Sequence, residues 1–248
     1  MHLKVWYFYF APNIGDDTII NMFRKKPVLQ YESAIEVYPN IVTPAKNHVP
    51  DWYKKEPKLK DNEKFDNHGI KHCIPLLDSF ISGYMIVLPN DLYVKNNNGE
   101  PYISWRYSVF PPQARKSPSN LNLIPTGHSP TEFVWHTAAA TSLPVGYSML
   151  YTHPLNRHDL PFTTLSGIID GGFTTSGSGN IPFFIKKDFE GIIHQGTPII
   201  QIIPYCQENW ISKETKGLVK KGLENDERSA SVASGWYKKI FWAKKQYD

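Results

Sequence analysis

Short apolar runs separated by turn residues dominate the middle of the sequence. They are rich in Val, Ile, Tyr, Phe and Trp and are too short for typical helices, so each one predicts a β-strand. "NNNGE" at 96–100 predicts a tight turn that pairs the strands on either side of it as a hairpin. The predicted strands lie within 83–89, 91–95, 101–110, 132–136, 146–154, 181–186 and 191–205.

The first 70 residues follow a different pattern. Prolines recur so closely there that no long helix can form. "VWYFYF" at 5–10 predicts a first strand, and "HVPDWYKK" at 48–55 predicts a short helix. In that helix Pro50 would stand in the first turn and Asp51 near the positive end of the helix dipole. Residues 1–70 are therefore expected to form an irregular, Pro-rich arm.

The last 38 or so residues are charged and helix-permissive. Trp236, Ile240 and Phe241 follow roughly helical spacing, with lysines between them. Residues 111–131 are rich in Pro, Ser and Asn and predict a long surface loop. The sequence thus predicts a mainly β protein, with an arm at 1–70, a β core at 71–210 and a partly helical extension at 211–248.

Composition narrows the possible classes of protein. With 248 residues, 41% hydrophobic, the chain can bury a sizeable core. The net charge of +4 comes from a few basic clusters, which indicates solvated charged faces rather than a nucleic-acid interface. Cys73 and Cys206 form no CxxC pair, so neither a thiolate zinc site nor a disulfide framework is expected. No apolar run reaches the roughly 18 residues that a membrane span needs.

Three features could carry chemistry. Asp170 could be a general base, or it could accept backbone N–H bonds at a "DGG" turn whose glycines supply positive φ. "TTSGSGN" at 174–180 could cradle an anion or could connect a hairpin. His136, Asp170 and His194 could form an iron-type facial triad if the fold brought them together. The seven tryptophans could stack bases, although core packing is the commoner role for such residues.

The order of motifs in the second half is more specific. "LPVGYSMLYTHP" precedes "FTTLSGIIDGGFTTSGSGNIPFFIKKDFEGIIHQGTPIIQIIPY". This series, over Gly146–Tyr205, resembles the dUTPase and dCTP deaminase superfamily, whose members have a β-clip fold. The whole chain also looks like an uncharacterised family common in tailed phages of marine bacteria, on the basis of "PDWYKK", "KHCIPLLDSFISGYMI" and "GYSMLYTHPLN".

The resemblance implies roles for four residues. Asp170 would orient and deprotonate the attacking water of a dUTPase, and Phe173 would stack on the sugar. Ser148 would donate to a phosphate oxygen, and Gln201 would reach the site of a neighbouring subunit. It also implies a homo-oligomer, with a trimer favoured, and Mg²⁺ as a cofactor only in a working nucleotide hydrolase.

The chain departs from the family at the groups that hold the nucleotide and the metal. Tyr147 replaces an arginine, and this would remove a charge-assisted contact to phosphate of around 1.5–3 kcal/mol. Met85 stands near the position of an acidic residue and cannot hold Mg²⁺. The strand "NIPFFIK" lacks the glutamate of the deaminases, and the Gly-rich, Arg-containing tail of dUTPases has no counterpart.

We therefore expect a phage-associated, non-catalytic β-clip protein that acts as a structural or binding component without a cofactor. It would lie in the cytoplasm of an infected bacterial host or in the virion, and other phage proteins would be its partners. Tyr147, Ser148, Phe173 and Gln201 would line the ligand pocket. The alternatives are a divergent nucleotide pyrophosphatase or deaminase that uses Asp170, and a metal-dependent enzyme that uses histidines such as His136 and His194.

Overall fold

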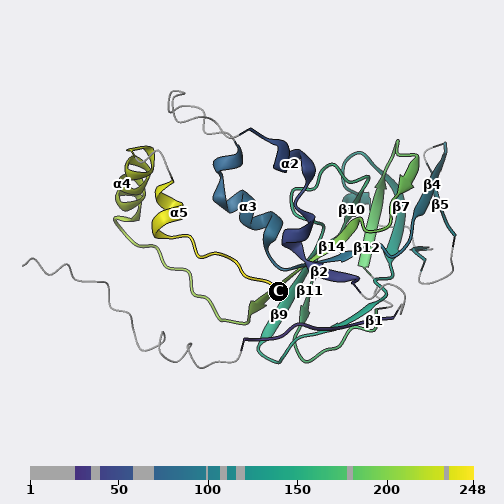
Figure 1. Cartoon of the computed structure of the whole chain (residues 1–248), viewed down its shortest axis with the longest axis horizontal. Coiled ribbons are helices and arrows are strands. Elements are labelled where there is room, and N and C mark those ends of the chain that lie inside the picture. Colours follow the sequence, from purple (N-terminus) through teal and green to yellow (C-terminus); the bar gives the residue numbers. More distant parts are fainter. Residues whose placement is uncertain are drawn as a thin grey trace, which may run out of the picture.

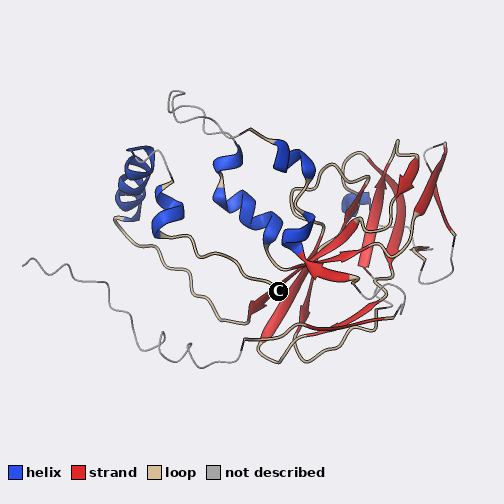
Figure 2. Cartoon of the chain, in the orientation of Figure 1, coloured by secondary structure: helices blue, strands red, loops and turns tan. Residues whose placement is uncertain are grey.

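The computed structural model describes residues 26–34, 40–57, 70–98, 100–106, 111–115, 121–177, 181–231 and 235–248. Strands fill one side of the molecule, and most helices lie on the other side (Figure 1, Figure 2). The prediction of a mainly β protein is confirmed. The strand predicted at 5–10 lies outside the described residues.

The strands that the structure describes form four antiparallel sheets. The largest has five strands, in the order β11-β9-β14-β3-β2. Its strands are β11 (Gly167–Asp170), β9 (Tyr147–Thr152), β14 (Pro198–Cys206), β3 (Tyr84–Val87) and β2 (Val42–Pro44). Among the described strands, β11 pairs with β9 alone and is therefore an edge strand.

The other three sheets cover the remaining predicted strands. The four-stranded sheet contains β10 (Phe162–Thr164), β12 (Ile181–Lys186), β7 (His128–Trp135) and β6 (Gln113–Ala114). The three-stranded sheet contains β13 (Gly191–Ile193), β4 (Leu92–Asn97) and β5 (Glu100–Trp105). β1 (Gln30–Ser33) pairs with β8 (Ala139–Ser142). The predicted hairpin is confirmed, because Asn97 of β4 pairs with Glu100 of β5.

The core lies between the sheets and is rich in aromatic rings. Trp135 stacks on Phe183, with their ring planes 7° apart, and meets Phe162 edge-on. The Trp135 indole N–H donates to the Thr164 hydroxyl at 2.9 Å, so the buried ring is satisfied at its polar end as well. These tryptophan and phenylalanine side chains serve packing, as expected for a β protein.

Helices lie between and beyond the strands. Their bounds are η1 (Ala45–His48), α2 (Asp51–Lys55), η2 (Ile70–His72), α3 (Ile74–Ile81), η3 (Leu121–Leu123), α4 (Leu218–Ser231) and α5 (Trp236–Ile240). The predicted short helix is confirmed as α2, with Pro50 as its N-cap and Asp51 in its first turn. η3, β6 and the start of β7 occupy parts of the segment predicted to be one long loop.

α3 is the clearest departure from the β core expected at 71–210. Pro75 stands in the first turn of this helix, where a missing N–H is tolerated. Phe80 is buried and packs against Tyr53 of α2, with 4.9 Å between ring centroids. An apolar stretch of eight residues fits a strand or a buried helix equally well by pattern, and tertiary packing decides between them.

The interpretation of "TTSGSGN" at 174–180 as a hairpin connection between β11 and β12 is wrong. β11 pairs with β9, whereas β12 pairs with β10 and β7, so the connection crosses between two sheets. On the way Thr175 N–H donates to the Thr141 carbonyl, and Thr174 forms a bridge with Ser142. Residues 178–180 of this segment lie outside the described residues.

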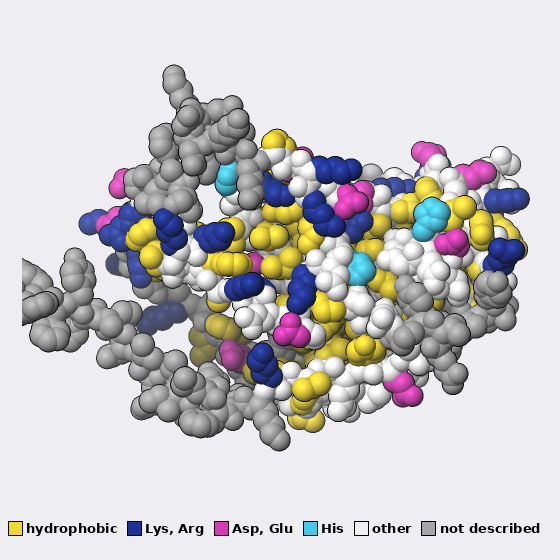
Figure 3. All heavy atoms as spheres, in the orientation of Figure 1, with side chains coloured by type: hydrophobic (Ala, Val, Ile, Leu, Met, Phe, Trp, Pro, Cys, Tyr) yellow, Lys and Arg dark blue, Asp and Glu magenta, His cyan; other side chains and the backbone are white. Residues whose placement is uncertain are grey.

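The C-terminal extension leaves the sheet and then returns to it (Figure 1). The exposed segment 207–217 leads to α4, and Lys and Arg side chains gather at the end of the molecule where α4 and α5 lie (Figure 3). Residues 242–248, the tail, then dock on the body: the Trp242 indole donates to both carboxylate oxygens of Asp78 at 3.0 Å. No helix among the described residues is long and apolar enough to cross a membrane. The boundaries at 70 and 210 remain predictions.

Candidate functional site

Asp170 and Ser148 lie side by side on the edge of the five-stranded sheet. They are direct partners in the β11–β9 ladder, and the Ser148 hydroxyl donates to Asp170 Oδ1 at 2.7 Å. The Gln207 side-chain amide, just beyond β14, donates to Ser148 Oγ at 2.9 Å and to the same Asp170 oxygen at 3.0 Å. Ser148 is 2% exposed, whereas Asp170 is exposed. These three residues form what we call the Asp170 cluster.

The turn after Asp170 explains the glycine pair. Gly172 has φ of +86°, a conformation that favours glycine. Gly171 donates to the Tyr147 carbonyl at 2.7 Å, and a Cβ there would stand 2.1 Å from the Pro144 carbonyl oxygen. Gly172 thus supplies the predicted positive φ, whereas Gly171 is required by a close backbone contact. The donors to the Asp170 carboxylate in the described chain are side chains rather than backbone N–H groups.

Gln201 lies apart from the Asp170 cluster. It is four residues from Tyr205 along β14, or about 13 Å at the usual rise of a strand, and Tyr205 is the residue opposite Ser148. Its side chain is 0% exposed. Its amide N–H groups donate to the carbonyls of Ser79 and Ser82 at 2.9 and 2.8 Å, and its oxygen accepts from Leu155 N–H at 2.8 Å. Gln201 therefore joins α3 to the sheet within one chain.

Tyr147, Phe173 and Met85 occupy three different surroundings. Tyr147 is half-buried and packs against the core. Phe173 is 65% exposed beyond the glycine turn. Met85 is 2% exposed and packs with Ala45 and Val87. Of the residues carried over from the resemblance, the fold brings Asp170 and Ser148 into contact, with Tyr147 and Phe173 nearby in sequence.

The two candidate histidines do not share surroundings either. Burial lowers the pKa of His136, whose Nε2 is buried without a hydrogen-bond partner in the described chain. His194 is exposed, with its Nδ1 3.7 Å from the Asp91 carboxylate. Within the described ranges no group of three His, Cys, Asp or Glu side chains is arranged to hold a metal ion. The metal-site alternative therefore has no set of converging ligands in this part of the chain.

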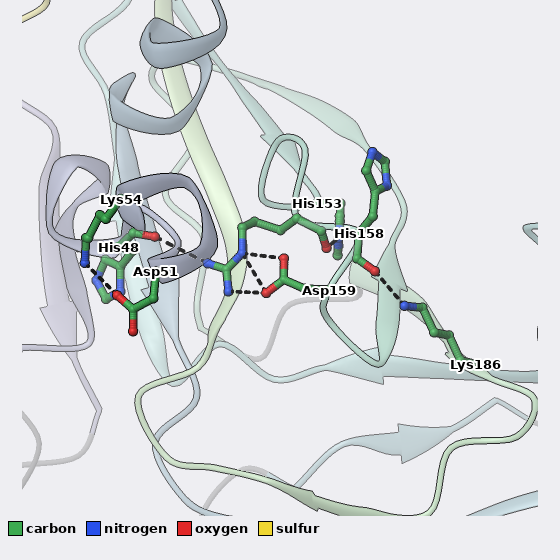
Figure 4. Close-up of polar contacts among 8 residues, drawn as sticks. His48, Asp51, Lys54, His153, His158, Asp159 and Lys186 are labelled. Carbon is green, nitrogen blue, oxygen red and sulfur yellow. Dashed lines mark hydrogen bonds and ion pairs between the residues drawn. The ribbon is translucent and has the colours of Figure 1, made fainter. Parts of the chain in front are cut away.

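A second polar network lies in the loop between β9 and β10 (Figure 4). The Arg157 guanidinium donates to both carboxylate oxygens of Asp159, at 2.8–3.2 Å, and to the carbonyl of His48 at 3.3 Å. The His153 ring accepts from Thr164 N–H at 3.3 Å through Nδ1, and its Nε2 lies 3.1 Å from the Arg157 carbonyl. Sequence reasoning missed this network, although the polar run "NRHD" at 156–159 was a signal for it.

Burial and charge shift three pKa values in this network. Desolvation lowers the pKa of His48, and the positive charges of Arg157 and Lys54 lower it further. Desolvation also lowers the pKa of His153 and outweighs its hydrogen bond to a carbonyl. Burial alone would raise the pKa of Asp159, but the hydrogen bonds and charge of Arg157 lower it overall. Arg157 forms an ion pair with Asp159 and donates to the His48 carbonyl, and it thereby joins this loop to η1.

Comparison with known proteins finds several similar solved structures, phage dUTPases among them. No family description matches the chain, and no curated protein matches it. One similar structure is a mutant dUTPase from phage phi11 of S. aureus, described for its coordination of a structural Mg(II) ion. It is 14% identical, the match covers 76% of this chain and 97% of that one, and the TM-score is 0.31.

Another is a mutant dUTPase of Staphylococcus bacteriophage 80alpha with dUpNHpp. It is also 14% identical, the match covers 76% of this chain and 88% of that one, and the TM-score is 0.32. Both proteins belong to the superfamily that the motifs of this chain resemble.

Proposed function

We propose that this chain is a dUTPase-like β-clip protein that serves as a structural or binding component and does not hydrolyse nucleotides. The observation that carries this proposal is the Asp170 cluster. The single proton of the Ser148 hydroxyl is donated to Asp170, so it is not directed outward to a phosphate. The same Asp170 oxygen also accepts from Gln207, so Oδ1 already has two donors within one chain.

The residues around the cluster support a binding role. Ile168 of the edge strand is 63% exposed, and Phe173 and Tyr205 are also exposed large side chains. β11 presents an edge of the five-stranded sheet beside them that no described strand pairs with. An open strand edge with apolar neighbours is a surface that proteins commonly cover by association. We propose that copies of this chain, with a trimer favoured, or other phage proteins cover it in an infected host cell or a virion.

A divergent nucleotide hydrolase is the second candidate. One observation favours it: the fold places Asp170 and Ser148 in contact at an exposed position, and the resemblance assigns both residues to a nucleotide site. In that case Asp170 would be the general base, and bound Mg²⁺ would neutralise phosphate charge. The buried Met85 and the internally bonded Gln201 would contribute nothing to such a site.

A nucleotide panel separates the two candidates. Purified protein is assayed with dUTP, dCTP and dTTP plus Mg²⁺ for pyrophosphate release, ammonia release and thermal stabilisation. Asp170→Asn is measured alongside Asp188→Asn, a matched change at an exposed aspartate on another turn. We expect no turnover and no stabilisation by any nucleotide. Turnover that disappears in Asp170→Asn and persists in Asp188→Asn would establish the hydrolase and refute the non-catalytic proposal.

A further inference from the structure

A cavity of about 300 Å³ lies where the tail meets the five-stranded sheet and the described N-terminal segment. Four tyrosines that are far apart in sequence line it: Tyr84 from β3, Tyr147 from β9, Tyr205 from β14 and Tyr247 from the tail. This volume is at the lower end of the range for small-molecule pockets, which are mostly apolar and aromatic with a few polar groups. The Asp170 cluster does not line it, and Tyr147 is the one lining residue that was also expected in the ligand pocket.

The polar groups of the cavity are few. Lys26 and the Gln246 amide line it together with the tyrosines, and Lys26 is the one charged residue among the described lining residues. Burial raises the pKa of Tyr84 and of Tyr247, so both phenols stay protonated at neutral pH. Aromatic walls favour a flat, aromatic occupant, and an ammonium group favours a negative charge on it.

From this lining we propose that the cavity binds a small planar aromatic acid. The aromatic ring lies among the tyrosine rings, which pair well in edge-to-face or offset geometry. The carboxylate meets Lys26, with the Gln246 amide as an additional donor. A non-aromatic ring of the same size would lose the ring–ring contacts, and a neutral aromatic amide would lose the ion pair.

The tail forms one wall of this cavity. Tyr247 meets Tyr84 edge-on, with 5.7 Å between ring centroids, and the Tyr84 hydroxyl lies 3.4 Å from the carbonyl of Asp248. Asp78 holds the tail further along, through Trp242. The wall is therefore supplied by a docked segment, and Tyr247 can be changed without altering any residue of the β core.

Benzoate is the probe that tests the proposal. Its binding to the full chain is titrated by ligand-observed NMR, with cyclohexanecarboxylate as the non-aromatic control and benzamide as the neutral one. We expect saturable binding of benzoate with a dissociation constant on the order of 1 mM, as suits so small a ligand. Cyclohexanecarboxylate and benzamide should each bind at least about fivefold more weakly.

Three variants test whether benzoate binds in this cavity. Tyr247→Ala should weaken benzoate binding by about tenfold, and Lys26→Gln should make benzoate and benzamide bind alike. Tyr102→Ala removes a tyrosine that is exposed on β5 and does not line the cavity, and it should leave the affinity unchanged. No saturable binding of benzoate below about 10 mM, equal binding of cyclohexanecarboxylate, or no effect of Tyr247→Ala would each overturn the proposal.

Discussion

Gln201 makes three hydrogen bonds to backbone groups of α3 and the β9–β10 loop from a fully buried position. Replacing it with leucine keeps much of its volume but leaves two carbonyls and one N–H unpaired. We expect Gln201→Leu to lower the free energy of unfolding by about 3 kcal/mol or more. Urea denaturation followed by circular dichroism measures this change.

Gln207 provides a matched comparison at an exposed position. Gln207→Leu removes two hydrogen bonds to the Asp170 cluster, but water can replace them. We expect a loss of about 1 kcal/mol or less. A larger loss for Gln207→Leu than for Gln201→Leu would contradict the assignment of Gln201 as the internal support of α3.

Two half-buried histidines of the Arg157 network, His48 and His153, give the stability a pH dependence. His48 and His153 both have a pKa below the ordinary value of about 6.5 that applies in the unfolded chain. The unfolded chain therefore binds protons more readily, and protonation favours unfolding. Their contribution is fully present above pH about 6.5 and is lost as the pH falls through that value toward the folded pKa. Protonated His153 could no longer accept from Thr164 N–H through Nδ1.

We expect the melting temperature to fall between pH 7 and pH 5 or so. In the double variant His48→Asn, His153→Asn the fall should be smaller, because neither group titrates. Asp159, whose pKa is lowered, stabilises the fold above its unfolded pKa of about 4, and this contribution is lost only as the pH falls below that value, outside this window. An unchanged pH slope in the double variant would show that other groups cause the dependence.

At the scale of elements, the glycine turn after β11 sets the position of the Asp170 cluster. A Cβ at Gly171 would collide with the Pro144 carbonyl, whereas Gly167, at the start of the same strand, has no atom within 4 Å of a Cβ. We expect Gly171→Ala to cost about 3 kcal/mol or more and Gly167→Ala about 0.5 kcal/mol or less. Thermal denaturation of the two variants gives the comparison, and equal losses would refute the close contact.

Elements with a clear local pattern were predictable from the sequence. The β4–β5 hairpin followed from "NNNGE", and α2 from Pro50 and Asp51. α3 was not predictable, because its short apolar stretch fits either a strand or a buried helix until Phe80 meets Tyr53. Strand pairing between distant segments also left no local mark, so the crossing from β11 to β12 was missed.

The candidate site was likewise predictable from the sequence only in part. The motifs placed Asp170 near Ser148, and the β11–β9 register brings them into contact. Gln207 was missed because it follows the strand in an irregular segment, where no periodicity marks its direction. Gln201 carries a motif glutamine, yet its partners are backbone groups of α3, and sequence contains no signal of such long-range hydrogen bonds.

At the scale of the whole molecule, the tail is held to the body through contacts with Lys46, Tyr84 and Asp78. Asp78 contacts two residues of the tail. That carboxylate accepts from the Trp242 indole and lies 3.7 Å from Lys245 Nζ. We expect Asp78→Ala to free the tail and to speed tryptic cleavage at Lys244 and Lys245 severalfold. Cleavage at Lys213, in a segment that is already exposed, should keep its rate, and mass spectrometry follows all three sites.

Asp91→Ala is the control for this experiment. Asp91 accepts from Gln195 N–H and lies near His194, but it makes no contact with the tail. Its replacement should leave the cleavage rates at Lys244 and Lys245 as they are in the unaltered chain. Equal acceleration by Asp78→Ala and Asp91→Ala would mean that general loosening, not release of the tail, exposes these lysines.

Because the tail is joined to its docking surface by residues 207–241, its binding is a unimolecular process. The tether sets an effective concentration, typically in the millimolar range for a short flexible connection, and the length and stiffness of α4, α5 and their linkers determine its value. Diluting the protein leaves the tail docked. A free peptide with the tail sequence would displace the tail only above that effective concentration. The length and stiffness of residues 207–241, rather than the protein concentration, therefore determine how often the tail forms its wall of the tyrosine cavity.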